Sequence, residues 1–381
     1  MRFSNQEYTT RLDKARAVLK DKDCQALLCL SPELLYYFAG YDAHTHFSVQ
    51  ALVFDITATP PTFVYRDVDT GLVEESCWLD DVRSYHHGEV DPIGLVASAC
   101  RERLASGQRL GVCFNSHAVK GTLALALAEA LIDFDLVQVD TAIESIRLQK
   151  SPAELECLHT AGEYANAGLT RALEVTRPGM TEIQLAGEIE AAMREQGSEY
   201  PAMPAWVSSG PRTRGAHKLP SRRVIESGDR VKLEFAGVHC RYHAVTMQTY
   251  WVSEPPAEPV SRIYDVASDA LLAGEAAIRA GDPVARAELA AFTVLQQHGF
   301  DLRWHSRFGY GVGIAYPPTW LESLDITRES SQQFESGHSF VLHIAVKDPI
   351  EQLGLMLGGA YLLGDDGLVC TSGGALDKVV V

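Results

Sequence analysis

The chain contains the stretch Gly228-Asp229-Arg230-Val231-Lys232-Leu233-Glu234-Phe235-Ala236-Gly237, followed after four residues by Tyr242-His243-Ala244-Val245-Thr246-Met247-Gln248-Thr249. It lies inside a strand-rich region predicted over residues 205–252. Glu234 has the apolar neighbours Leu233, Phe235 and Ala236, so an exposed position is disfavoured. Because burial of an unpaired carboxylate is costly, this glutamate is a candidate functional residue rather than a solvated strand residue.

The first 150 residues alternate between helical and strand patterns. Apolar residues recur at helical spacing over residues 7–21, and residues 120–132 are rich in the helix formers alanine and leucine. Short apolar runs predict strands at residues 26–30, 48–54, 62–65, 109–114 and 136–139. This alternation predicts a smaller α/β domain with a mixed sheet over residues 1–150.

A second domain is predicted over residues 151–381. Its first helix begins at Ser151-Pro152-Ala153-Glu154, with a serine N-cap, a first-turn proline and a capping-box glutamate. Thr181 and Gln184 form a second capping box. Helices are predicted at residues 152–175, 182–196, 260–280 and 285–298, around the strand-rich region and before a Gly-rich, strand-rich end. This arrangement predicts an α+β domain with internal two-fold character.

Composition excludes several classes of protein. The chain has 381 residues, 46% of them apolar, and a formal charge of −17, which argues against binding nucleic acid or an anionic membrane surface. No run reaches the roughly 18 apolar residues of a membrane helix, and the N-terminus has no apolar signal region, so we expect a cytoplasmic protein. The eight cysteines have no Cys-x-x-Cys spacing and are expected to be reduced. Cys240 stays open as an exception, because it lies between Glu234 and His243.

Three further motifs follow the same order as in a known superfamily. They are Ser208-Ser209-Gly210-Pro211-Arg212-Thr213-Arg214-Gly215-Ala216-His217, Gly309-Tyr310-Gly311-Val312-Gly313-Ile314-Ala315-Tyr316-Pro317-Pro318 and Gly337-His338-Ser339-Phe340-Val341-Leu342-His343. With these motifs the chain resembles the pita-bread superfamily of creatinase, prolidase and aminopeptidase P. Within it, the chain is most similar to the metal-free branch of ectoine hydrolases and creatinase. The resemblance implies a pita-bread catalytic domain over residues 151–381 behind a creatinase-type N-terminal domain.

The resemblance also places this chain's residues at the metal positions of the superfamily's metallopeptidases. Those enzymes carry two aspartates eleven residues apart on the first hairpin, where this chain has Glu234 and Val245. Tyr310 stands for a ligand histidine, His343 approximately for a ligand glutamate, and Gly358 or a neighbour for the last glutamate. Glu234 and His343 fall short of the three protein ligands that a catalytic metal usually keeps. We therefore expect no metal and no other cofactor.

Metal-free cleavage is reasonable for a substrate whose reacting carbon is already cationic. An amidinium carbon needs no Lewis acid, a carboxylate complements its charge, and a histidine can move the required proton. The resemblance implies a hydrolase that cleaves a non-peptide C–N bond of a small cyclic amidine or guanidino compound, with Glu234 as nucleophile or base and His217 as acid–base partner. Four further residues are predicted to bind the substrate or else to be packed core residues: Trp206, His243, Tyr310 and His343.

Other functions remain open at this stage. The same site could perform an elimination or a cyclisation, or the protein could be a non-catalytic, peptide-binding pita-bread protein. Gln248 stands where relatives place an arginine, which favours a changed substrate or lost activity. The likeness to creatinase further implies a homodimer in which the first domain of one chain closes the pocket of the other. The candidate rim is Tyr41-Asp42-Ala43-His44-Thr45-His46-Phe47.

Overall fold

The computed structural model describes the chain apart from residues 1, 44–46, 301–306, 349–352 and 375–376. The chain forms two compact units, Met1–Arg147 and Leu148–Val381, and the division falls close to the boundary predicted near residue 150. Three residues of the predicted rim, His44, Thr45 and His46, lie outside the described residues. No described helix is both long and apolar enough to cross a membrane.

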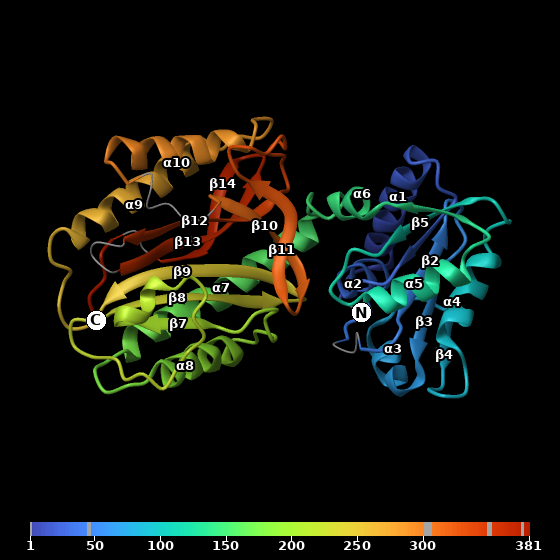
Figure 1. Cartoon of the computed structure of the whole chain (residues 1–381), viewed down its shortest axis with the longest axis horizontal. Coiled ribbons are helices and arrows are strands. Elements are labelled where there is room, and N and C mark those ends of the chain that lie inside the picture. The colour runs from blue at the N-terminus through green and yellow to red at the C-terminus, as the bar shows by residue number, and fades with distance from the viewer. Residues whose placement is uncertain (1, 44–46, 301–306, 349–352, 375–376) are drawn as a thin grey trace. The chain divides into compact units, whose positions relative to one another are not determined.

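The first unit is built on a six-stranded sheet in the order β4-β3-β2-β1-β5-β6. The strands are β1 (Ala26–Cys29), β2 (Ala51–Asp55), β3 (Thr62–Arg66), β4 (Val82–Tyr85), β5 (Arg109–Cys113) and β6 (Asp135–Gln138). The central strand β1 runs antiparallel to β2 and parallel to β5. The predicted mixed sheet is therefore confirmed (Figure 1).

The helices of this unit are α1 (Asn5–Asp21), α2 (Pro32–Ala39), α3 (Thr70–Ser76), α4 (Pro92–Arg101), α5 (Gly121–Ala130) and α6 (Asp140–Ser145), with a 3₁₀ turn η1 (Asp67–Asp69). The sequence predicted α1 and α5 but not α2, α3, α4 or α6. The side chains of α2 are buried on almost every side, so they lack the alternation of apolar and polar faces that marks a surface helix. Its start is marked by Ser31, whose side chain accepts a hydrogen bond from the backbone N–H of Leu34, and by Pro32 in the first turn.

The second unit contains one large antiparallel sheet. Its strands are β7 (Trp206–Ser209), β8 (Arg230–His239), β9 (Tyr242–Trp251), β10 (Gly309–Tyr316), β11 (Thr319–Ile326), β12 (Ser339–Asp348), β13 (Leu353–Gly364) and β14 (Gly367–Gly373). The order is β11-β10-β12-β13-β9-β8-β7, with β14 beside β13 and a further pairing of β10 with β9. The predicted strand-rich region is thus interrupted by the 3₁₀ turn η2 (Gly210–Arg214) and the loop after it.

Two helix pairs cover this sheet (Figure 1). They are α7 (Pro152–Val175) with α8 (Glu182–Glu195), and α9 (Val260–Ala276) with α10 (Ala285–Gln297). Helix α7 packs on β8 and β9, and α9 packs on β12 and β13. Both predicted capping boxes are present, Ser151 with Glu154 and Thr181 with Gln184. The α+β pita-bread architecture expected from the sequence is confirmed by this repeat of helix pair and strands.

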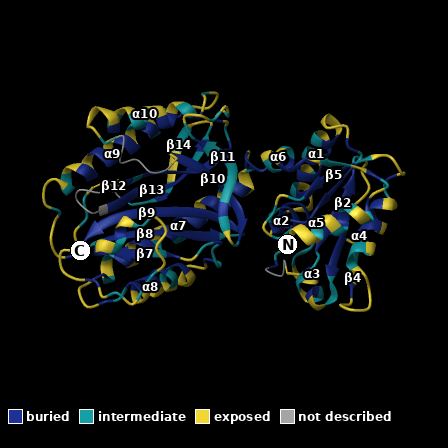
Figure 2. Cartoon of the chain, in the orientation of Figure 1, coloured by how far each residue is buried: buried dark blue, intermediate teal, exposed yellow. Residues whose placement is uncertain are grey.

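Strands β8 and β9 are buried along almost their whole length (Figure 2). Successive side chains of a strand point to opposite faces, so β8 divides its residues between two environments. Gly237 faces α7, where a Cβ would lie 2.2 Å from the carbonyl oxygen of Ala161 and 2.6 Å from the amide nitrogen of Ala165. Glu234, three residues earlier, faces away from α7. Contact of the α7 backbone with β8 therefore fixes the strand whose other face carries the carboxylate.

We expect Gly237→Ala to destabilise the second unit, because the added methyl group would overlap the α7 backbone. Overpacking of this kind typically costs about 1–3 kcal/mol, measurable as a loss in the free energy of unfolding in urea. Gly187→Ala is the matched control, since this exposed glycine of α8 has nothing within 4 Å of an added Cβ. That control should gain up to about 1 kcal/mol from helix propensity. Equal effects of the two substitutions would contradict the packing argument.

Candidate functional site

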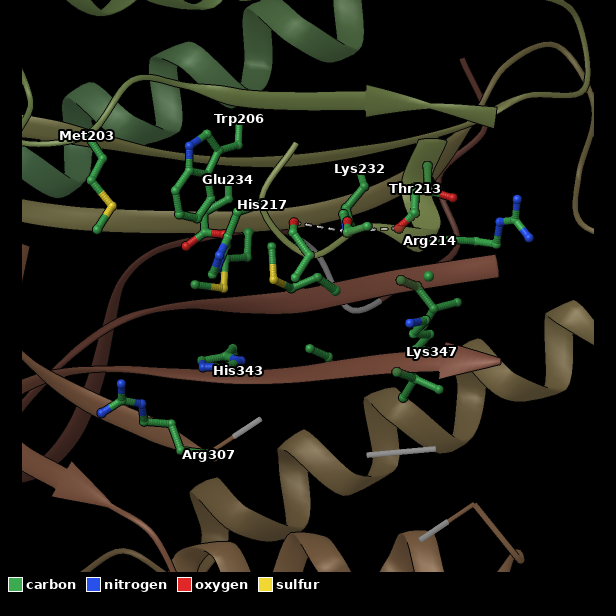
Figure 3. Close-up of a pocket in the computed structure, with 18 of the residues that line it drawn as sticks. Met203, Trp206, Thr213, Arg214, His217, Lys232, Glu234, Arg307, His343 and Lys347 are labelled. Atoms are coloured by element: carbon green, nitrogen blue, oxygen red, sulfur yellow. Dashed lines mark hydrogen bonds between the residues drawn. The ribbon is translucent and has the colours of Figure 1, made fainter. Parts of the chain in front are cut away.

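A cavity of about 460 Å³ opens on the face of β8 that is turned away from α7. Its wall comes from β7, the loop after η2, β8, β9, β10, β11, β12 and β13. The structure brings five of the six predicted site residues into this wall: Trp206, His217, Glu234, Tyr310 and His343. Figure 3 shows Trp206, His217 and Glu234 grouped together, with His343 on the strand across from them.

Glu234 is the only acidic residue in the described part of the cavity wall. Its register partners are Trp206 on β7 and Met247 on β9, so the carboxylate emerges between two large apolar side chains. Only 5% of the residue is exposed. Burial raises the pKa of Glu234 to about 8, against the opposing effect of the Lys232 ammonium. Burial therefore favours the protonated form of this carboxyl group.

His217 lies over the ring of Trp206, with 4.2 Å between the ring centroids. Trp206 therefore touches His217 while pairing with Glu234 across the sheet, and it connects the two candidate catalytic groups. His217 is still accessible to solvent. Partial burial and, to a smaller extent, the charge of Lys232 lower the pKa of His217 below its usual value. The imidazole is consequently neutral at pH 7 and able to accept a proton.

Lys232 is a site residue that the sequence reasoning missed. Its ammonium donates hydrogen bonds to the carbonyl oxygens of Thr213 at 2.9 Å, Gly215 at 2.6 Å and Ala216 at 3.3 Å. These bonds fix the loop that carries His217 to the strand that carries Glu234 (Figure 3). Burial lowers the pKa of Lys232 to about 8, and the nearby Glu234 carboxyl opposes this. The signal was in the sequence, because residues two apart on a strand share a face.

Tyr310 and His343 form the wall opposite Glu234. The hydroxyl of Tyr310 accepts a hydrogen bond of 3.1 Å from the indole N–H of Trp320. His343 is 4% exposed, and its Nδ1 has no hydrogen-bond partner among the described residues. Burial, with the charges of Arg307 and His217, lowers the pKa of His343 to about 4. A buried polar atom without a partner is costly, so Nδ1 of His343 is suited to bind a polar group of a ligand in the cavity.

His243 is not part of the cavity wall, contrary to the prediction that it binds the substrate. Its Nε2 accepts a hydrogen bond of 2.9 Å from the backbone N–H of Ala202, and its Nδ1 contacts the carbonyl oxygen of Arg241 at 2.8 Å. Both ring nitrogens are thus used inside the fold, and burial lowers the pKa of His243 to about 4. His243 is a neutral core residue that holds the chain before β7.

Gln248 also lies away from the cavity. It is one residue after Met247 on β9 and therefore faces the other side of the sheet. Its side-chain amide donates to the hydroxyl of Tyr264 on α9 at 3.3 Å. The place where relatives carry an arginine is therefore a contact between sheet and helix, and the glutamine removes no charge from the cavity wall.

The wall is rich in cationic side chains that the sequence reasoning did not connect. Besides Lys232 it includes Arg214, Arg307 and Lys347, in a chain whose total charge is −17. Arg307 forms an ion pair with Asp325 at 2.9 Å, which places its guanidinium at the Tyr310 side of the cavity. These residues come from four separate segments, so no local pattern in the sequence could group them.

The residues at the superfamily's metal positions do not fit a two-metal centre. Val245 packs in an apolar cluster with Met247 and Tyr310, and it has no lone pair to offer. Gly358 has no side chain, and a Cβ there would lie 2.3 Å from the carbonyl oxygen of Leu342. The remaining donors, Glu234 and His343, are too few for a pair of divalent ions, each of which needs several oxygen or nitrogen ligands.

Comparison with known families agrees with the division of the chain. Residues 156–369 match the model of metallopeptidase family M24, and residues 11–149 match the creatinase/prolidase N-terminal domain. The chain is 25% identical to the ectoine hydrolase of Halomonas elongata over 383 residues, which covers 96% of this chain and 95% of that protein. It is 26% identical to an uncharacterized hydrolase/peptidase, y4tM, of Sinorhizobium fredii, with 90% of each chain covered.

Among solved structures, the dipeptidase PepE from Mycobacterium ulcerans superposes with a TM-score of 0.86 at 25% identity, and the match covers 100% of both chains. The recombinant prolidase from Thermococcus sibiricus superposes with a TM-score of 0.89 at 20% identity, over 99% of this chain and 100% of that one. The fold is therefore shared with proteins that carry peptidase names as well as with an ectoine hydrolase.

The raised pKa of Glu234 predicts a difference in the pH dependence of stability between the parent protein and Glu234→Gln. The unfolded carboxyl ionises near 4.5 and the folded one near 8, so the folded state binds more protons between these values. The free energy of unfolding of the parent should therefore fall, relative to the variant, as pH rises from about 5 to about 8. At about 1.4 kcal/mol per pKa unit, the change should be about 2–5 kcal/mol.

Urea unfolding of both proteins at these two pH values provides the measurement. Curves with the same pH dependence for the parent and Glu234→Gln would mean that the carboxyl of Glu234 is not held protonated in the folded state.

Proposed function

The chain belongs to metallopeptidase family M24, and from this starting point we propose that it is a metal-independent hydrolase of that family that cleaves a C–N bond of a small cyclic amidine or guanidino compound. The observation that carries the proposal is the buried carboxylate of Glu234, set between Trp206 and Met247 in a cavity of about 460 Å³. Val245, which pairs with Ala236 two residues further along β8, stands where a metallopeptidase needs an oxygen ligand. The similarity to an ectoine hydrolase over nearly the whole chain supports the same substrate class.

Glu234 is the one side chain in the described cavity wall that can complement the charge of a cationic reacting group. Burial favours the protonated form of its carboxyl group by raising the pKa. An amidinium placed against it stabilises the carboxylate and lowers this pKa, so that binding of the substrate releases a proton and creates the base. A neutral peptide carbonyl offers no such charge, and it usually depends on a Lewis acid that the residues of this wall do not fit.

Hydrolysis then needs one water molecule and two proton transfers. Glu234 takes a proton from water while the water oxygen bonds to the amidinium carbon. As the C–N bond breaks, His217 passes the proton of the newly formed hydroxyl group to the departing nitrogen, and the amide carbonyl forms. The products are an amide and an amine. His217 suits this role because its imidazole is neutral at pH 7 and lies over Trp206, the register partner of Glu234.

The remaining wall residues would orient the substrate. Nδ1 of His343 is buried without a partner among the residues that the structure describes, and it can bind a ring nitrogen or a carboxylate oxygen, depending on its tautomer. Trp206 provides an aromatic face at which a flat cation can stack. Lys232 acts as a positioning residue, because its hydrogen bonds hold the loop of His217 in place.

Replacing either catalytic candidate should remove turnover and leave the fold intact. Glu234→Gln keeps size and hydrogen bonding but cannot act as a base, and His217→Asn cannot transfer the proton. A positioned acid–base group contributes about 10²–10⁴-fold, so each variant should lose kcat on that scale with ectoine, creatine or a related amidine as substrate. Hydrolysis is followed by release of the amine product, together with circular dichroism of each variant.

Glu288→Gln is the matched control for the glutamate. Glu288 is 3% exposed on α10 and its pKa is also raised by burial, but it lies outside the cavity wall. The control should retain the parent rate. A folded Glu234→Gln protein that turns over at the parent rate would refute the catalytic assignment. Hydrolysis of an X-Pro dipeptide in preference to every amidine tested would refute the substrate class.

We also expect turnover to be indifferent to metal. Dialysis against a strong chelator should leave kcat unchanged, because the donors at the cavity do not form a metal centre. Elemental analysis before and after dialysis gives the metal content of the same samples. About two zinc or manganese ions per chain, with turnover lost on their removal and restored by their return, would contradict the metal-independent mechanism.

A further inference from the structure

A second group of reactive side chains lies in the second unit, away from the cavity. Among the described residues, Cys157, His239 and Cys240 bring one potential ligand atom each to within 4.8 Å of one another. None of the three lines the cavity. His239 is five residues after Glu234 on β8, roughly 16 Å along the strand, and it is on the face turned towards α7. The group is therefore separate from the candidate active site.

The elements that hold this group are firmly fixed to each other. Cys157 is on α7, and His239 and Cys240 are at the turn between β8 and β9. Three residues before Cys157, Glu154 accepts a hydrogen bond of 2.6 Å from the hydroxyl of Tyr242, just after the turn. The turn itself is held by Arg241, whose backbone and side-chain N–H groups both donate to Glu199 at 2.9 Å. The donor atoms thus meet at a contact between helix and hairpin that other bonds already fix.

None of the three residues is fully exposed on the surface. Cys157 is 8% exposed, and His239 and Cys240 are partly buried. The Nδ1 atom of His239 lies 3.3 Å from the hydroxyl of Tyr164, two helical turns after Cys157 on α7. A hydrogen bond of this kind fixes the orientation of an imidazole, as an outer-shell partner does for a histidine that binds a metal.

Two sulfur atoms and an imidazole are soft to borderline donors. Such a set selects zinc or a similar thiophilic ion over magnesium or calcium, which prefer oxygen. In a tetrahedral zinc site, bond lengths of about 2.0–2.3 Å put neighbouring donor atoms roughly 3.5 Å apart. Donors already within 4.8 Å of each other reach this arrangement by small side-chain movements.

We propose that Cys157, His239 and Cys240 form a binding site for one zinc-class metal ion, which joins α7 to the β8–β9 hairpin. The fourth position is open to water. The site is structural: it holds the end of the hairpin that carries Lys232 and Glu234 further along β8. Because the thiols must lose their protons to bind the ion, the affinity rises with pH. The ion binds the folded chain and so raises its stability.

Cobalt absorption tests the proposal on the full-length protein. After chelator treatment under reducing conditions, titration with Co²⁺ should give one ion per chain, a thiolate-to-cobalt charge-transfer band and the strong visible bands of tetrahedral Co²⁺. Zn²⁺ should remove these bands by displacement. The melting temperature of the metal-free protein should rise on addition of Zn²⁺.

Variants assign the ligands. Cys157→Ser, His239→Asn and Cys240→Ser should each weaken Co²⁺ binding by more than about 100-fold, since loss of an outer-shell partner alone costs about 10–100-fold. Tyr164→Phe should fall in that lower range and keep the charge-transfer band. Cys77→Ser is the matched control, a partly buried cysteine in the other unit, and it should bind like the parent. Circular dichroism of each metal-free variant identifies any that fails to fold.

Glu234→Gln separates this proposal from the proposed function, because it should bind Co²⁺ at parent affinity whatever its effect on turnover. The site would be refuted by a parent protein without a charge-transfer band, by a Cys240→Ser variant that binds Co²⁺ at the parent affinity, or by a band lost in Glu234→Gln. A Cys157–Cys240 disulfide that persists in the presence of the reductant would also refute it, because neither sulfur could then bind the ion as a thiolate.

Discussion

The close contact between α7 and strand β8 is the constraint on which the rest of the second unit depends. At Gly237 there is no room for a side chain, because the α7 backbone occupies the space of a Cβ. Because successive side chains of a strand point to opposite faces, this contact also determines which face each further residue of β8 occupies. Gly237 and His239 face the helix, while Lys232 and Glu234 face the cavity. One face of the hairpin thereby packs against the helix, and the other face carries the candidate catalytic residue.

On the cavity side, the ionisable side chains of Lys232 and Glu234 influence each other's pKa. Lys232 donates three hydrogen bonds to the segment that leads to His217. Its charge also lowers the pKa of both His217 and Glu234. Burial disfavours the charged form of both Lys232 and Glu234, which leaves each with a pKa of about 8. In the proposed mechanism, a cationic substrate shifts this balance in favour of the carboxylate, so that Glu234 acts as a base once the substrate is bound. This is a physical reason why a metal-free member of the fold would act on amidines rather than on neutral peptides.

The chain therefore combines the scaffold of a metallopeptidase family with two expected ligand positions, Val245 and Gly358, whose side chains offer no donor atom. Valine and glycine at two ligand positions are not neutral replacements. Val245 joins an apolar cluster, and Gly358 permits a close strand contact that a glutamate would disrupt. The soft donors Cys157, His239 and Cys240 lie at the far end of the same hairpin. In the proposed arrangement, metal serves to hold the hairpin and has no part in the reaction.

Features that depend on short segments could be predicted from the sequence. They are the capping boxes of α7 and α8, the hairpin, the mixed first sheet and Glu234 as the main candidate for a catalytic residue. These follow from spacings of a few residues, which local backbone geometry controls. Helix α2 was not predicted, because a helix buried on almost every side has no amphipathic pattern. The grouping of Lys232, Arg214 and Arg307 with Glu234 in one cavity is visible only in the three-dimensional structure. The same holds for His243, a core residue whose two ring nitrogens both have partners. Whether a polar side chain faces a cavity or a backbone partner depends on segments far away in the sequence, and no local pattern contains them.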